Sequence, residues 1–128
     1  AFRRISLAPD VGSTWLLPRR IGVARAMELS LLGEKLPAEK ALAWGLINRV
    51  VDDGAALDEA MKLAREMAAG PTRALGLMRG LYWDSTENNF EDQLDLEYRM
   101  QREAGASEDF KEGVAAFLEK RAAKFKGK

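Results

Sequence analysis

The sequence predicts a mainly α-helical chain with at most two short strands, both in its first 51 residues. Beyond Asp52, apolar residues recur at the three- and four-residue spacing of one helix face. Prolines and glycines separate these runs in the order that helix starts and stops prefer. The 128 residues, of which 47% are hydrophobic, are enough for one ordinary domain with a core.

Two helices and two strands are expected up to Val51. The first helix follows from an apolar stripe that ends at a glycine, and the second begins at a proline and ends at a glycine. The strands are runs rich in apolar and β-branched residues. The stripe consists of Val23, Ala24, Met27 and Leu31. In chain order we expect a strand near Arg3–Leu7, a helix over Ile21–Leu32 with Gly33 as its stop, a helix from Pro37 to Gly45, and a strand over Leu46–Val51.

The turn Asp52-Asp53-Gly54 is the expected boundary between two parts of the chain. A helix should follow it, because apolar residues recur along one face up to a stop at Gly70. The next helix should begin at Pro71. The stripe of the first of these helices consists of Leu57, Ala60, Met61, Ala64, Met67 and Ala68.

Two further helices are expected in the last forty residues. Asn89 and Ser107 should cap them, because their side-chain oxygens can accept hydrogen bonds from unpaired backbone N–H groups. The basic tail, residues 120–128, is expected to be a solvated end. The apolar residues expected on the two helices are Phe90, Leu94, Tyr98 and Met100 on the first and Phe110, Val114, Phe117 and Leu118 on the second.

Composition excludes several classes of protein. Twenty basic residues balance twenty acidic ones, so no net field draws the chain to nucleic acid or to a membrane surface. The apolar runs are too short to span a bilayer and there is no secretory leader, so we expect a cytoplasmic location. Without cysteine or histidine, thiol nucleophiles, Ser-His-Asp triads and imidazole metal sites are excluded. No phosphate-binding loop or metal-ligand spacing is present, so no metal is expected.

Asp10 is the candidate for proton chemistry. It lies in the turn Pro9-Asp10-Val11-Gly12, just before the apolar start of a helix. A carboxylate on such a turn can face a cleft as a general acid or base. The local sequence favours the alternative that Asp10 caps the helix that follows. Both interpretations remain open on the residues alone.

Four motifs in order resemble the C-terminal half of the crotonase superfamily, the enoyl-CoA hydratase/isomerase family. The motifs are PDVGSTWLLPRRIG (9–22), RAMELSLLG (25–33), LPAEKA (36–41) leading to GLINRVV (45–51), and EGVAAFLEKR (112–121) followed by Phe125. The resemblance implies a parent of about twice this length with an α/β spiral of ββα turns. Residues 1–51 would finish the spiral domain, and residues 52–128 would form a helical oligomerisation region. The expected partners are an acyl-CoA thioester and further copies in a homotrimer or hexamer.

The resemblance also implies roles for individual residues. Hydratases of the family carry a glutamate seven residues before the motif's proline, where this chain has Phe2, and a glycine where it has Asp10. Asp at that place serves as the base in some isomerases of the family, so Asp10 is expected to be catalytic. Phe117 and Lys120 match positions that contact the adenine and phosphate end of CoA. The two backbone donors of the oxyanion hole would lie outside this chain.

The expected function is therefore part of a CoA-thioester isomerase, with CoA as part of the substrate and no separate cofactor. An enoyl-CoA hydratase is the first alternative. The second is a non-catalytic helical assembly module, which is what the isolated fragment could be. Alone, the fragment is expected to be inactive, because it lacks the oxyanion hole.

Overall fold

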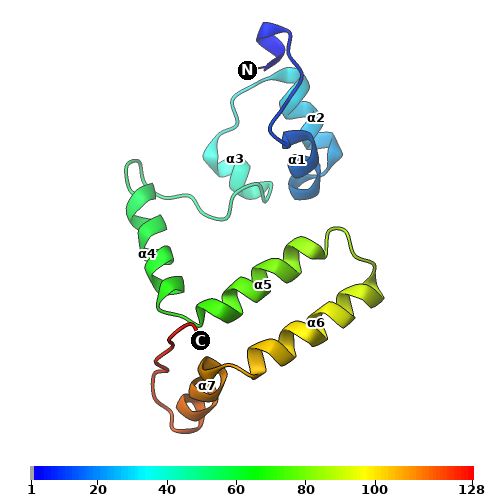
Figure 1. The fold of residues 1–128 in the computed structure, drawn as a ribbon. Helices are drawn as coiled ribbons and strands as arrows, with labels where there is room; N and C mark the ends of the chain where they lie inside the picture. Colours follow the sequence, from blue (N-terminus) through cyan, green and yellow to red (C-terminus); the bar gives the residue numbers. More distant parts are fainter. Residues whose placement is uncertain (1) are drawn as a thin grey trace. The chain divides into compact units, whose positions relative to one another are not determined.

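Helices are the only regular elements in the computed structural model, which describes residues 2–128 (Figure 1). The prediction of a mainly helical chain is confirmed. The chain divides into two compact units, the first ending at Gly54 and the second spanning Ala55–Lys128. None of the described helices has the length and apolar character that crossing a lipid bilayer requires.

In the first unit, two consecutive helices pack on each other. Gly22 separates them, because its φ of 78° and ψ of 158° lie outside the helical region. The helix predicted over Ile21–Leu32 therefore begins two residues later, and its stop at Gly33 is confirmed by a left-handed φ of 66°. The elements of this unit are the 3-10 helix η1 (Phe2–Ile5), α1 (Ser13–Ile21), α2 (Val23–Leu32) and α3 (Ala38–Ala43), which follows Pro37 as predicted.

The two predicted strands are not formed by the described residues. The first is replaced by η1, and the φ of 59° at Ser6 interrupts any extended backbone there. Leu46–Val51 has no regular structure. A strand is stable only when a neighbour completes its backbone hydrogen bonds, and residues 2–128 contain no such neighbour. Both strand predictions are wrong for this chain.

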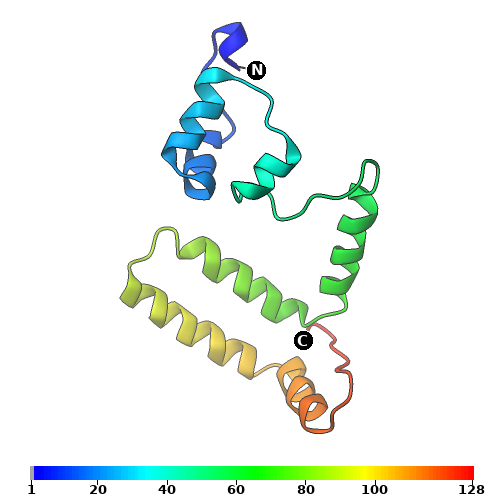
Figure 2. The same cartoon turned by 180° about the vertical axis from the view of Figure 1, so that it is seen from behind.

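The second unit is built around a helical hairpin. Helices α5 (Thr72–Asp84) and α6 (Phe90–Gly105) run side by side in opposite directions (Figure 2). The helix α4 (Ala56–Ala68) packs on α5, and α7 (Glu108–Leu118) packs on α6. Both predicted caps are confirmed. Asn89 Oδ1 accepts from the N–H of Asp92 at 2.9 Å, and Ser107 Oγ accepts from the N–H of Phe110 at 3.0 Å.

Most of the predicted apolar stripes face outward in this structure. Val23, Met27 and Leu31 of α2 are each more than half exposed, as are Leu57 and Met67 of α4. The chain exposes 10337 Å², whereas two independent compact globules that share its mass would together expose about 8,200 Å². The stripes are therefore surfaces suited to contact with further protein rather than a core. The buried apolar residues of the described part are Ile21, Ala26, Ala41 and Ala116.

Candidate functional site

Asp10 begins a tight turn that leads into α1. The backbone N–H of Ser13 donates to the Asp10 carbonyl oxygen at 3.0 Å, and the Ser13 hydroxyl donates to the same oxygen at 2.7 Å. The two central residues have left-handed backbones, with φ of 52° at Val11 and 72° at Gly12, as in a type I′ turn. Two hydrogen bonds thus fix the backbone of Asp10 beside a rigid helix start.

The side chain of Asp10 does not cap α1. The N-cap residue is Gly12, and no side chain accepts a capping hydrogen bond there. Asp10 is exposed, and its carboxylate has no hydrogen-bonding or ionic partner among residues 2–128. The capping interpretation is therefore wrong, and the carboxylate is accessible to a ligand.

Val11 shows that this turn is strained. A β-branched residue rarely adopts a left-handed backbone, because its Cβ approaches the following carbonyl oxygen at a cost of about 1–2 kcal/mol. Val11 is 91% exposed in this unit, so burial of its side chain does not offset that cost. Backbone strain of this kind concentrates at functional sites. The strain next to Asp10 therefore favours the catalytic interpretation of that residue.

Phe117 lies on an open face near the end of α7. It is 83% exposed and so does not belong to the core of this unit. With Phe110, Val114 and Phe125 it lines an apolar groove of about 390 Å³. An exposed aromatic ring in such a groove can stack against a planar ring of a ligand.

Lys120 follows α7 in a left-handed conformation, with φ of 53°. Its N–H donates to the carbonyl oxygen of Phe117 at 3.3 Å, and the N–H of Arg121 donates to that of Ala116 at 3.0 Å. These two bonds form a Schellman motif, in which the left-handed position is usually glycine. Lys120 is exposed and has no carboxylate within ion-pair distance in the described part of the chain, so its ammonium is accessible to an anion.

The tail is attached to α7 through Arg121 and its backbone. Glu112 accepts two hydrogen bonds from the Arg121 guanidinium, at 2.6 and 3.0 Å, and one from the N–H of Lys124 at 2.8 Å. The bonds from Arg121, and then the bond from Lys124, lower the pKa of Glu112 to about 2. The basic side chains of the tail are exposed, as expected of a solvated end, but acidic groups on α7 hold its backbone N–H groups and the Arg121 side chain.

Asp109 binds the far end of the same tail. It is 4% exposed and accepts hydrogen bonds from the N–H groups of Lys126 at 2.7 Å and Gly127 at 2.8 Å. A Cβ at Gly127 would lie 2.5 Å from Oγ1 of Thr72, and the φ of Gly127 is 75°. Only glycine therefore lets the tail pass this closely to the start of α5.

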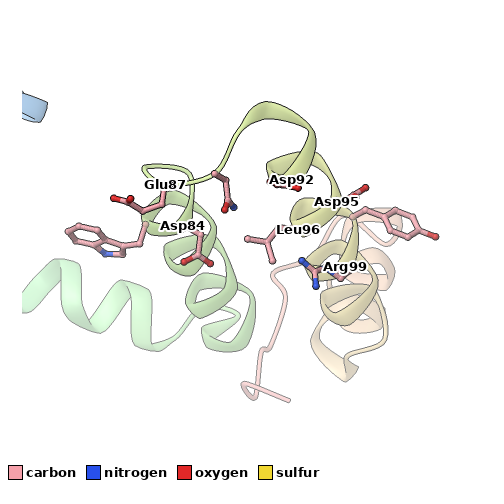
Figure 3. Close-up of a pocket in the computed structure, with 9 residues that line it drawn as sticks. Asp84, Glu87, Asp92, Asp95, Leu96 and Arg99 are labelled. Carbon is pink, nitrogen blue, oxygen red and sulfur yellow. The ribbon is translucent and has the colours of Figure 1, made fainter.

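An acidic cleft of about 750 Å³ lies at the tip of the α5–α6 hairpin (Figure 3). It contains none of the predicted site residues. Its carboxylates outnumber its single arginine, so it does not suit the phosphates of CoA. No group of three or more carboxylates among the described residues could hold a metal ion. The charged residues that line the cleft are Asp84, Glu87, Asp92, Asp95 and Arg99.

The predicted site residues lie in both units, with Asp10 in the first and Phe117 and Lys120 within one turn of each other in the second. Sequence analysis missed the tail contacts of Asp109 and Glu112. Acidic residues early in a helix are common whether or not they bind anything. The available signal is their three-residue spacing, which places both carboxylates on one face before a basic tail.

All 128 residues match the family described as enoyl-CoA hydratase/isomerase. The 1,2-epoxyphenylacetyl-CoA isomerase of Escherichia coli (strain K12) is 52% identical over 128 residues, which are 100% of this chain and 49% of that protein. The chain spans about half the length of the curated relatives it matches.

Solved structures of proteins described as enoyl-CoA hydratases or isomerases also match this chain. A Mycobacterium abscessus protein assigned to this family matches with a TM-score of 0.97 at 38% identity, over 100% of this chain and 49% of that one. An enoyl-CoA hydratase from Polaromonas sp. JS666 matches with a TM-score of 0.92 at 32% identity, over 98% of this chain and 49% of that one. The fold of this chain is thus shared with half of each of these proteins.

Proposed function

The chain belongs to the enoyl-CoA hydratase/isomerase family, and from this premise we propose that it serves as the C-terminal half of a CoA-thioester isomerase. The proposed substrate is 1,2-epoxyphenylacetyl-CoA, in the degradation of phenylacetate. The observation that carries the proposal is an accessible carboxylate, Asp10, on a strained turn of a chain that is 52% identical to an isomerase of that substrate. Residues 1–51 would complete the spiral domain, and residues 52–128 would form the oligomerisation region.

In the proposed mechanism, Asp10 takes a proton from one carbon of the thioester ligand and returns it to another. Loss of a proton beside a thioester carbonyl leaves an enolate, whose oxygen needs hydrogen-bond donors aimed at it. The family resemblance assigns those donors to the half that this chain does not include. Asp10 then supplies the acid and base, and the chain alone is expected to be inactive.

An enoyl-CoA hydratase is the alternative that the structural similarity to such enzymes favours. The residue at the place of the hydratase glutamate is Phe2 in η1, and its ring cannot accept a proton from water. We expect the complete enzyme to isomerise 1,2-epoxyphenylacetyl-CoA and to hydrate crotonyl-CoA at least about 100-fold more slowly. Steady-state assays with both substrates test this, and hydration that is faster than isomerisation would overturn the proposal.

Phe117 and Lys120 are proposed to bind the adenine and phosphate end of CoA. The support is an exposed aromatic ring and an exposed lysine within one turn of each other at the end of α7. Replacing Lys120 by Ala in the complete enzyme should raise the dissociation constant for acetyl-CoA about tenfold, because a charge-assisted contact to phosphate is lost. Isothermal titration calorimetry measures this constant.

Lys126→Ala is the matched control for Lys120→Ala. It removes the same charge from the same tail, while the backbone N–H that binds Asp109 remains. Its affinity for acetyl-CoA should stay within about twofold of the unaltered enzyme, since exposed charges a few residues apart are largely screened. Equal losses in the two variants would mean that the tail attracts CoA only through its net charge.

The complete enzyme is further proposed to be a homotrimer or a hexamer built from trimers. The support is the large apolar area that the helices of both units leave exposed. Sedimentation velocity at micromolar concentrations should give the mass of three or six copies. A single species with the mass of one copy would contradict the assembly.

A further inference from the structure

Lys120 and Arg121 are neighbouring cations with different surroundings. The Arg121 guanidinium is fully engaged, because Nε donates to Glu119 at 2.6 Å and its terminal nitrogens donate to Glu112 at 2.6 and 3.0 Å. Lys120 has no such carboxylate partner within residues 2–128. The Arg121 side chain therefore stabilises the fold through its ion pairs, and Lys120 is the cation that is available to a ligand.

The backbone of Lys120 needs support from its neighbours, since a non-glycine residue with φ of 53° is strained. On the helix side, the Schellman bonds from Lys120 to Phe117 and from Arg121 to Ala116 provide it. On the tail side, Glu112 supports the backbone of Lys120. This carboxylate binds both the Arg121 side chain and the Lys124 N–H, so the chain that leaves Lys120 is turned back along α7.

We propose that Glu112 is a positioning residue for the phosphate end of CoA. Through its bonds to Arg121, Glu112 fixes the backbone that carries Lys120. Glu112 does not touch the ligand. Its effect is to order Lys120 before CoA binds, so that binding does not have to order this segment. The inference rests on the proposed function, because it requires that Lys120 contact a CoA phosphate.

The test is a double-mutant cycle in the complete enzyme. Glu112→Gln removes the ion pair to Arg121 and retains an oxygen that can accept from Lys124. It should raise the dissociation constant and the KM for the CoA thioester about 3-fold to 10-fold, with kcat within about twofold of the unaltered value. In a Lys120→Ala background the same change should have no further effect on binding, since no ammonium remains to be positioned.

Two further variants make the test specific. Glu108→Gln removes an equal charge from an exposed residue of α7 that forms no ion pair with the tail, and it should leave KM unchanged. Glu119→Gln removes the other ion pair of Arg121 and leaves Glu112 in place. It should raise KM by less than Glu112→Gln does, because the two bonds to Glu112 remain. It provides the measurement if Glu112→Gln does not fold.

The outcomes separate the two proposals. If Lys120→Ala does not alter acetyl-CoA affinity, the CoA role of Lys120 is wrong, and the positioning role of Glu112 is wrong with it. If Lys120→Ala weakens binding but Glu112→Gln does not, only the positioning role is wrong. An equal effect of Glu112→Gln with and without Lys120 would also overturn it, because Glu112 would then act by another route.

Discussion

Replacing Asp10 by Asn should lower the turnover of the complete enzyme by about 10²–10⁴-fold, the usual contribution of a general acid or base. Asparagine keeps the size of the side chain but cannot take up a proton. Stability should not change, because the two hydrogen bonds that Asp10 accepts from Ser13 go to its backbone carbonyl oxygen. The measurements are kcat for 1,2-epoxyphenylacetyl-CoA and the midpoint of urea unfolding.

Asp52→Asn is the control for Asp10→Asn, since it removes an exposed carboxylate from a turn without a proposed role. It should leave both turnover and stability unchanged. Isomerase activity retained by Asp10→Asn would show that another group moves the proton. A large loss of stability in the same variant would show that the role of Asp10 is structural.

The residues around Asp10 could not exclude a cap, because capping depends on the backbone beyond Asp10. A capping aspartate needs an extended backbone at its own position and a helix directly after it. Here two left-handed residues, Val11 and Gly12, separate Asp10 from α1. Gly12 hinted at such a turn, whereas nothing in the sequence indicated that a valine would adopt the same conformation.

The sequence predicted correctly those features that depend on a single residue. The caps at Asn89 and Ser107 and the stop at Gly33 each depend on one side chain or one φ angle, and all three are confirmed. The strand over Leu46–Val51 depends on a partner strand, which the described residues do not contain. A sequence pattern predicts that a segment can form a strand, but the strand forms only where a second strand is present to pair with it.

The apolar stripes are largely exposed in this structure for a related reason. Periodicity shows that a helix has an apolar face, but not which protein covers it. On α2 the stripe that includes Met27 is exposed, while the small side chain of Ala26 is buried against its neighbours. In α6, Gln93 lies on the inner side of the hairpin and donates to the Leu81 carbonyl oxygen at 3.2 Å. A polar residue at a helix contact is not visible to a hydrophobic pattern.

Replacing Asp109 by Ala should release the far end of the tail. The carboxylate is nearly fully buried and accepts from the N–H groups of Lys126 and Gly127. Hydrogen bonds to a charged group contribute more than neutral ones, so we expect the free energy of unfolding to fall by about 2–3 kcal/mol. Hydrogen exchange measured on the complete enzyme should show that protection is lost at the amides of Lys126 and Gly127.

Glu108→Ala separates this effect from simple loss of charge at the start of α7. Glu108 lies in the same first turn and interacts with the same helix dipole, but it accepts no hydrogen bond from the tail. Its replacement should cost about 0.3–1 kcal/mol and leave both tail amides protected. Asp109→Asn, which keeps one oxygen acceptor, should give an intermediate loss of protection. If Lys126 and Gly127 stay protected in Asp109→Ala, the tail is held by contacts other than this carboxylate, such as the bond from the backbone N–H of residue 109 to the Lys128 carbonyl oxygen or the contact of Phe125 with Gly113.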